Sequence, residues 1–377
     1  MAMKRIGILT LNGYYNYGNR LQNYAMQEVL KSLGFNVETI LVDRNTANQE
    51  RFTERLYNLR RNSPIQIYYK IYNRCLRYIY KDAIKKRTTI FKKFTSEYIQ
   101  ETNYSISRNY IPEDLSNQYD YFITGSDQVW NPSSLGGSSI YFLTFAEKQK
   151  RIAYAPSFGV SQIESEYIEN YRKWISGMHK LSVREEDGAR LINELTGREA
   201  PVLVDPTMLL TREKWLSIAK EPYNKPKGKY LLTYFLGGVP RKYIGQIKNI
   251  AKDNKLEVVN LAVISEKDTY ITGPNEFIDY INSCSVFCTD SFHGVVFSML
   301  LEKPFIIYKR NESSTPTFSR IDTLLDKFNL NSRRAENIKT TEEIFHIDYS
   351  HLPPILEAER KKSLDYLKES LNVKDEN

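Results

Sequence analysis

Short apolar segments alternate with helical patterns along most of this chain. Runs rich in β-branched and aromatic residues predict strands, whereas apolar residues spaced three and four apart predict amphipathic helices. The predicted strands are residues 5–10, 37–42, 119–124, 152–154, 181–183 and 202–204, followed by 230–236, 256–264, 285–289 and 304–308. The predicted helices include residues 19–33, 274–284 and 292–301. Strands that alternate with helices in this way are typical of parallel sheets built from βαβ units.

The length of 377 residues exceeds what one hydrophobic core usually organises, so it predicts two domains. Residues 219–229 are polar and contain Pro and Gly, which indicates a linker. The predicted units are an N-terminal α/β domain over residues 1–218, a C-terminal α/β domain over 230–350, and a charged helix with a polar tail over 351–377. The predicted fold class is α/β, with two Rossmann-like domains that face a ligand-binding cleft.

Composition places the chain among globular proteins, because 41% of its residues are apolar and 26% are charged. The N-terminal segment has no long apolar region, and no apolar run is long enough to span a membrane, so we expect a cytoplasmic protein. The 3 cysteines and 4 histidines are scattered without metal-ligand spacing. We therefore expect no metal and no cofactor.

A strand-to-helix turn near residue 290 carries the strongest candidate chemistry. The strand ends at Thr289, and Asp290 or Ser291 can serve as the N-cap of the apolar helix that follows. The first N–H groups of such a helix favour phosphate or carboxylate. Gly294 would let a ligand approach the backbone, and His293 can act as an acid or a base. The alternative is that the turn only caps the helix and His293 packs beneath it.

Two further segments place polar side chains directly after predicted strands. Arg184 follows the strand at 181–183, and its planar guanidinium could clamp a carboxylate or phosphate. The first turn supplies hydrogen-bond donors suited to a polyol or phosphate, and it lacks the G-x-G-x-x-G dinucleotide fingerprint. Its polar residues and glycine are Asn16, Gly18, Asn19 and Arg20. Ion pairing and ordinary capping are the alternatives for these segments.

The turn after residue 124 contains Asp127, Gln128 and Trp130. A carboxylate, an amide and an aromatic ring form a mixture that is common at carbohydrate sites, since they bind hydroxyls and stack on a sugar ring. The alternative is a structural loop with Trp130 in the core.

The ordered set of these motifs resembles the polysaccharide pyruvyl transferase family, also called ketal-pyruvyltransferases. The matching segments are NYGN at 16–19, LQ at 21–22, GSDQVWN at 125–131, YAPSFG at 154–159, SVRE at 182–185, DPT at 205–207, DSFHG at 290–294 and KPF at 303–305. They occur in family order from near residue 5 to near residue 310, so the resemblance covers most of the chain. It implies a fold similar to that of GT-B glycosyltransferases.

The resemblance also implies a reaction, the transfer of the enolpyruvyl unit of phosphoenolpyruvate to a hexose diol as a cyclic pyruvate ketal, with release of phosphate. It implies that Arg184 and the segment Ser291, Phe292, His293 and Gly294 hold this donor on the C-terminal side of the cleft. Some family members have Arg where this chain has Ser291. We therefore expect another cation here, with Arg310 and Lys309 as candidates.

On the acceptor side, the N-terminal domain is expected to bind the sugar. The residues we assign to this role are Asn16, Gly18, Asn19, Arg20, Gln128 and Trp130. Our hypothesis for catalysis is that His293 is the general acid that protonates the methylene carbon of the donor. Asp127 is a weaker catalytic candidate on the acceptor side.

The net charge of +8 is concentrated in one helical insertion near residues 44–100. From Arg44 to Lys93 there are 14 Lys and Arg residues against 3 Asp and Glu, a local charge of +11. Helical spacing places Lys70, Arg74, Arg77, Lys81 and Lys85 on one face, and Tyr68, Tyr72, Cys75, Ile79 and Ala83 on a stripe half a turn away.

This basic face has two interpretations. It could lie on the anionic inner face of the plasma membrane, which would suit a lipid-linked precursor of a capsule or exopolysaccharide. Alternatively, the apolar stripe packs on the domain and the basic face is only solvated. No nucleic-acid-binding module accompanies the charge, so we expect no nucleic-acid partner.

Two other functions remain open. A GT-B glycosyltransferase that uses a sugar nucleotide is weakened because no acidic residue is clearly placed after a C-terminal strand to hold a ribose. The second is a non-catalytic glycan-binding protein. The presence of both Arg184 and His293 argues against this function.

Overall fold

The computed structural model describes residues 3–43, 74–132, 138–236, 238–310 and 318–373, and it contains two parallel sheets. The N-terminal sheet has the order β3-β2-β1-β4-β5, with β1 (Arg5–Leu9), β2 (Asn36–Val42), β3 (Glu101–Ile106), β4 (Tyr121–Thr124) and β5 (Arg151–Ala153). The C-terminal sheet has the order β7-β6-β8-β9, with β6 (Tyr230–Tyr234), β7 (Glu257–Leu261), β8 (Val286–Thr289) and β9 (Phe305–Ile307).

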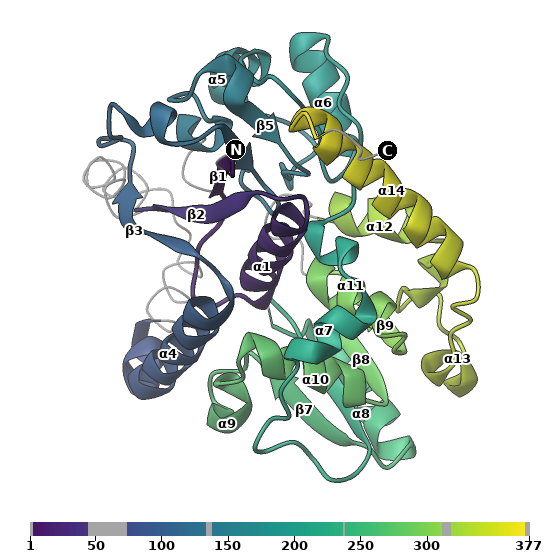
Figure 1. The fold of residues 1–377 in the computed structure, drawn as a ribbon. Helices are drawn as coiled ribbons and strands as arrows, with labels where there is room; N and C mark the ends of the chain where they lie inside the picture. The colour runs from purple at the N-terminus through teal and green to yellow at the C-terminus, as the bar shows by residue number, and fades with distance from the viewer. Residues whose placement is uncertain (1–2, 44–73, 133–137, 237, 311–317, 374–377) are drawn as a thin grey trace.

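Helices pack around both sheets, so each half of the chain is a Rossmann-like α/β unit (Figure 1). The first half contains α1 (Tyr17–Ser32), α4 (Lys81–Tyr98), α5 (Ser165–Ser176), α6 (Glu186–Thr196) and α7 (Arg212–Ile218). The second half contains α8 (Arg241–Asp253), α9 (Lys267–Tyr270), α10 (Pro274–Ser283), α11 (Phe292–Leu300), α12 (Ser319–Lys327), α13 (Thr341–Phe345) and α14 (Leu352–Ser370). The predicted fold class, two α/β domains in a GT-B-like arrangement, is confirmed.

The apolar pattern located most of the strands. β1, β2, β5, β8 and β9 begin and end within one residue of their predicted limits. The prediction missed β3, a polar edge strand that pairs with β2 among the described residues and has only two of its six residues buried. It was wrong at 181–183 and 202–204, where the structure has a single bridge between Val183 and Val202.

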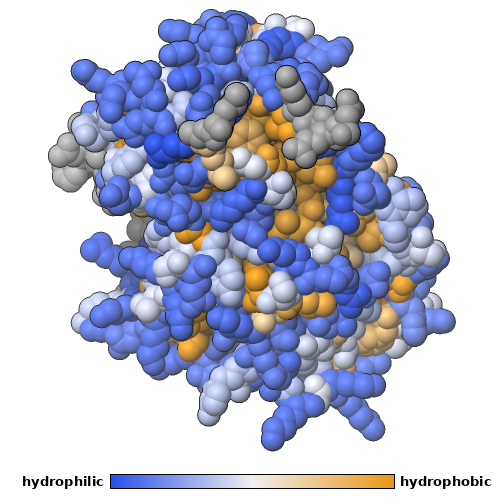
Figure 2. All heavy atoms as spheres, viewed as in Figure 1, coloured by the Kyte–Doolittle hydropathy of each residue, from blue (hydrophilic) through white to orange (hydrophobic). Residues whose placement is uncertain are grey.

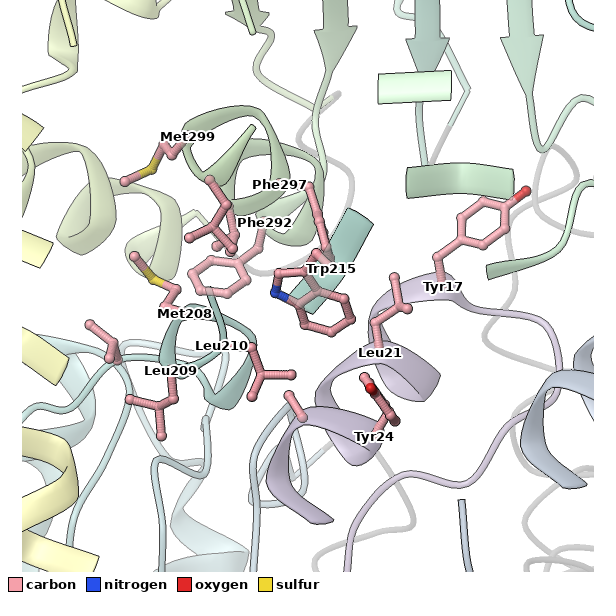
Figure 3. Close-up of a cluster of buried hydrophobic side chains, with 14 of the residues drawn as sticks. Tyr17, Leu21, Tyr24, Met208, Leu209, Leu210, Trp215, Phe292, Phe297 and Met299 are labelled. Atoms are coloured by element: carbon pink, nitrogen blue, oxygen red, sulfur yellow. The ribbon is translucent and has the colours of Figure 1, made fainter. Parts of the chain in front are cut away.

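One hydrophobic cluster runs through both domains. Tyr17 at the start of α1 stacks on Phe277 of α10, with ring centroids 4.3 Å apart. Trp215 of α7 packs against Tyr24 of α1 and Phe297 of α11, with ring centroids 5.6 and 4.8 Å apart, respectively (Figure 3). These aromatic contacts hold the two domains against each other and fix the position of α1 relative to α11.

Helix α14 follows the C-terminal domain in sequence but packs on the N-terminal domain (Figure 1). Arg360 donates hydrogen bonds to the carbonyl oxygens of Met208 and Leu210 at 2.7 and 2.8 Å. The hydroxyl of Tyr366 donates to the carbonyl of Ala153 in β5 at 2.8 Å. The chain therefore crosses between the domains twice.

The basic insertion is helical over residues 74–79 and again in α4. Four of its predicted basic residues are exposed: Arg74, Arg77, Lys81 and Lys85. Of the predicted apolar stripe, Ala83 is buried, but Cys75 and Ile79 are exposed, so the stripe was wrong at these two positions. The reason is a turn at Tyr80, which interrupts the continuous helical spacing that the prediction assumed. Lys70, Tyr68 and Tyr72 lie outside the described residues.

The face seen in Figure 1 is largely hydrophilic, and its hydrophobic residues gather mainly in a patch in the upper middle of the view, with smaller spots below it (Figure 2). Within the described ranges, no helix has both the length and the apolar character needed to cross a bilayer.

Candidate active site

A cavity of about 230 Å³ lies where strands from both sheets end. Its walls include Leu11 after β1, Asp127 after β4, Leu236 after β6 and Asp290 after β8. The carboxyl ends of parallel strands are the usual ligand-binding edge of such sheets. The cavity is therefore the candidate active site, shared by the two domains.

The turn after β8 presents the N-terminus of α11 to this cavity. Ser291 is the N-cap, because its Oγ accepts a hydrogen bond from the N–H of Gly294 at 3.3 Å. The N–H groups of Phe292 and His293 belong to the first turn, which has no intrahelical acceptors, so they favour an anion in the cavity.

Gly294 has a packing role that was not predicted. A Cβ at this position would lie 2.8 Å from Oγ1 of Thr289 and 3.1 Å from the ring of Phe287. The missing side chain lets α11 pack closely on β8. Gly294 does not itself line the cavity, and its prediction as a donor contact stays a prediction.

His293 lines the cavity, with only 7% of its surface exposed. Its Nε2 lies 3.6 Å from Oδ2 of Asp205. The ring also packs against Gly18 at the start of α1, where any Cβ would overlap the imidazole. Gly18 thus makes room for His293 and does not itself line the cavity, so its prediction as an acceptor contact stays a prediction.

Asp205 joins His293 to Arg184 in a buried ion network. Arg184 Nη1 donates to Asp205 Oδ2 at 2.7 Å, and Arg184 Nη2 lies 3.4 Å from Asp127 Oδ1. Burial would raise the pKa of Asp205, but His293 and Arg184 together hold it well below its usual range. The carboxylate therefore stays ionised and can compensate the charge of a protonated His293. From the sequence, Asp205 is only part of the DPT segment at 205–207, with no predicted role.

Asp127 is the second ionised carboxylate of the network. Its Oδ1 accepts from the N–H of Gln128 at 2.8 Å, and its Oδ2 accepts from the side-chain amide of Asn19. Burial would raise the pKa of Asp127, but the charges of Arg184, His293 and Arg320 lower it. An ionised carboxylate is an acceptor only, so Asp127 suits the binding or deprotonation of a hydroxyl.

Arg184 does not line the cavity itself but lies next to Phe292, which does. Its guanidinium lies 4.5 Å from the ring centroid of Phe292, and Phe292 forms part of the cavity wall. Arg184 lines a much smaller space on the other side of this ring. The structure thus brings the predicted donor clamp next to the cavity, with its two terminal nitrogens directed to Asp205 and Asp127.

Two arginines of the C-terminal domain line the cavity directly. Arg310 donates through Nε to Oδ2 of Asp290 at 2.7 Å, as one of the two predicted replacement cations. The other, Lys309, forms an ion pair with Glu336 at 3.5 Å instead. Arg320 in α12 was not predicted at all, because it lies in an amphipathic helix and belongs to no recognisable motif.

On the acceptor side, the cavity wall contains Asn16, Asn19 and Gln128, as predicted positions, and also Tyr15, which is 62% exposed. Two predicted residues are wrong here.

Trp130 is completely buried, stacked on Phe142 at 4.8 Å, and its Nε1 donates to the carbonyl of Tyr141 at 3.0 Å. Arg20 is also fully buried and forms an ion pair with Glu101 at 2.8 Å. Both side chains stabilise the N-terminal domain and leave no surface for a sugar.

Two parallel α/β domains with a cavity between them define this chain as a protein with a GT-B-like fold. More specifically, residues 16–312 match the family model described as polysaccharide pyruvyl transferase. The chain belongs to this family.

Among solved structures, the chain is similar to a putative UDP-N-acetylglucosamine 2-epimerase from Listeria monocytogenes, with a TM-score of 0.49 and 8% identity over 97% of this chain and 91% of that chain. It is also similar to the UDP-GlcNAc 2-epimerase of Neisseria meningitidis, with a TM-score of 0.49 and 11% identity over 98% of this chain and 100% of that chain. A third is the ADP-heptose lps heptosyltransferase II of E. coli, with a TM-score of 0.34 and 11% identity over 98% and 99%. A search of curated proteins found no match to the sequence.

Proposed function

We propose that this protein transfers the enolpyruvyl group of phosphoenolpyruvate to a hexose diol of a polysaccharide precursor, forming a cyclic pyruvate ketal and releasing phosphate. Family membership supports pyruvyl transfer. The observation that carries the proposal is the position of His293, at the N-terminus of α11, inside the interdomain cavity and 3.6 Å from the carboxylate of Asp205.

The donor fits the charge of the site. Phosphoenolpyruvate carries a carboxylate and a phosphate, and the cavity offers the first turn of α11 with Arg310 beside it. Arg184 contributes positive charge from behind Phe292. Ser291 keeps its hydroxyl engaged as the helix cap, so its contribution to donor binding is to expose the N–H groups that follow it.

In the first chemical step, His293 gives a proton to the methylene carbon, which becomes a methyl group and leaves positive charge on the adjacent carbon. A sugar hydroxyl adds to that carbon and loses its proton to a base. Phosphate then departs with the electrons of its C–O bond, and a second hydroxyl adds to the same carbon and loses its proton. Asp127 is the candidate base, because it is ionised and lines the cavity.

In this proposal, the sugar acceptor binds to the wall of the cavity that the N-terminal domain forms. Asn16 and Gln128 can hydrogen-bond to sugar hydroxyls, and the exposed ring of Tyr15 can stack on a sugar face in the role first assigned to Trp130. A lipid-linked acceptor and a peripheral membrane position form part of the proposal. The exposed basic residues of the insertion support this part, since they could attract anionic headgroups.

Two measurements test the proposal. Phosphoenolpyruvate should raise the melting temperature of the protein, because a ligand that binds only the folded state stabilises it, whereas nucleotide sugars should not. Phosphate release from phosphoenolpyruvate with a sugar acceptor should fall by about 100-fold or more in His293→Gln, as expected for loss of a general acid. Stabilisation by a nucleotide sugar alone would instead indicate a glycosyltransferase. Near-wild-type turnover of His293→Gln would remove its role as the acid.

A further inference from the structure

Arg320 is a buried cation that faces the cavity with few partners of its own. Only 9% of the residue is exposed, and its Nε has no hydrogen-bond partner within the described part of the chain. Among the described residues, its ion pair is a long one, with Nη1 3.9 Å from Oδ1 of Asp127. A buried guanidinium normally has its donors satisfied, so this arrangement indicates a missing anionic partner.

The carboxylate that Arg320 approaches is already compensated. Asp127 lies 3.4 Å from Arg184 and also accepts hydrogen bonds from Asn19 and Gln128. Asp205 is likewise shared by Arg184 and His293. Asp127 and Asp205 are therefore both engaged by other groups, and Asp127 lies too far from Arg320 for a short hydrogen bond.

A third buried carboxyl group, Glu185, is also engaged by other groups. Its Oε1 is turned toward the N–H groups of Phe158 and Gly159, at 2.8 and 3.1 Å. Burial raises the pKa of Glu185, while the charges of Arg184 and Arg320 act in the opposite direction. Burial, together with the charge of Arg184, lowers the pKa of Arg320 to about 10, so Arg320 is still protonated near neutral pH.

Arg320 also lies beside the N-terminus of α11. Its guanidinium is 5.9 Å from the ring centroid of Phe292, a residue in the first turn of that helix, and both residues line the same cavity. An anion bound to the first-turn N–H groups would therefore have a charged, forked donor next to it.

We propose that Arg320 binds the phosphate group of the donor, next to the first turn of α11. This inference rests on the proposed function for the identity of the donor. It assigns the phosphate to Arg320 and α11, and it assigns Arg184 to holding Asp127 and Asp205 in place.

The test compares two small anions, orthophosphate and pyruvate, by calorimetric titration of the full-length protein. Removing a charged hydrogen-bond donor in Arg320→Gln should weaken phosphate binding by about 10- to 100-fold, while pyruvate binding changes by less than about threefold. Arg190→Gln is the matched control, since Arg190 is half-exposed on α6 and pairs with Asp187 and Glu194. It should bind both anions like the wild type.

Unchanged phosphate binding by Arg320→Gln, or an equal loss of phosphate and pyruvate binding, would overturn the assignment. If Arg320→Gln does not fold, Arg320→Lys decides, because it keeps the charge but loses the forked geometry. We then expect a selective loss of phosphate affinity of at least about threefold, and either no loss or an equal loss for pyruvate overturns the assignment. A wild-type protein that binds neither phosphate nor phosphoenolpyruvate would contradict the proposed function itself.

Discussion

Gly18 and Gly245 differ in how much space a Cβ atom would have at each position. At Gly18 a Cβ would overlap the ring of His293, whereas at Gly245 in α8 the same atom would meet open space. Glycine at residue 18 is therefore required by an atom on the opposite domain. The position of the imidazole depends on this close approach between α1 and α11.

We predict that Gly18→Ala displaces His293 and lowers kcat by about 100-fold, the loss expected when a catalytic group moves by about 1 Å. Phosphate release under saturating donor measures it. Gly245→Ala is the control and should keep full activity, since alanine is favoured over glycine in a helix. Equal activity of the two variants would show that His293 tolerates the shift.

Asp205 links stability to pH. Its pKa in the folded protein lies below the usual value of 3.8, so the unfolded chain takes up the proton first as the pH falls. The stabilisation is complete above about pH 4 and is lost as the pH falls toward the folded-state pKa. Glu185 acts in the opposite direction, because its pKa is raised.

We predict that Asp205→Asn lowers the free energy of unfolding at pH 7 by about 3–5 kcal/mol, because it leaves Arg184 buried with less countercharge. The difference from wild type should shrink as the pH is lowered below about 4. Urea unfolding at several pH values measures both effects. A difference that stays constant with pH would contradict the assigned linkage.

The sequence located residues that follow strands but could not show which way each side chain points. Asn19 and Arg20 are neighbours, yet a helix turns by about 100° per residue, so Asn19 reaches the cavity and Arg20 reaches Glu101. Trp130 follows the same turn as Asp127 but enters the core. Arg320 could not be found, because its role arises only when α12 packs beside α11.

At the level of elements, buried strands were predictable because a parallel sheet requires continuous apolar runs. β3 has no such run, since it lies at the sheet edge, and the pattern therefore missed it. The insertion shows a similar limit. Its basic residues are exposed as expected, but α4 is anchored by Phe91, Phe94 and the buried Arg87, which donates to the hydroxyl of Tyr17 at 3.0 Å.

If the exposed basic residues attract a membrane, anionic lipid vesicles should sediment the protein, and salt should weaken the binding. We predict that changing Arg74, Arg77, Lys81 and Lys85 to Gln abolishes this binding, since each contributes about 1 kcal/mol near a charged surface.

The control removes the same charge from α8, by changing Arg241, Lys242, Lys248 and Lys252 to Gln; all four residues are exposed. That variant should sediment like the wild type. Equal losses in both variants would show that net charge alone matters, and no sedimentation of the wild type would favour a merely solvated basic face.

For the whole molecule, the two-domain fold was predictable from the alternation of strands and helices, whereas the tight union of the domains was not. The contacts that join them are aromatic residues from α1, α7, α10 and α11, which look like ordinary core positions in the sequence (Figure 3). Their partners lie in the other half of the chain, and no local pattern reveals that pairing.

We predict that Trp215→Ala destabilises both domains together, because the indole packs between α1 and α11. The loss should be about 3–5 kcal/mol, as for other buried aromatic residues, and unfolding should remain a single transition. Thermal unfolding followed by calorimetry measures both. Two separate transitions would show that the domains are energetically independent.

The crossing of α14 has a consequence for biosynthesis. Domains generally begin to fold in the order in which the ribosome releases them. Here the surface near Ala153, Met208 and Leu210 is contacted by a helix that is synthesised after both sheets. The first domain to emerge must therefore wait for α14, and until then that surface is open to proteases and chaperones.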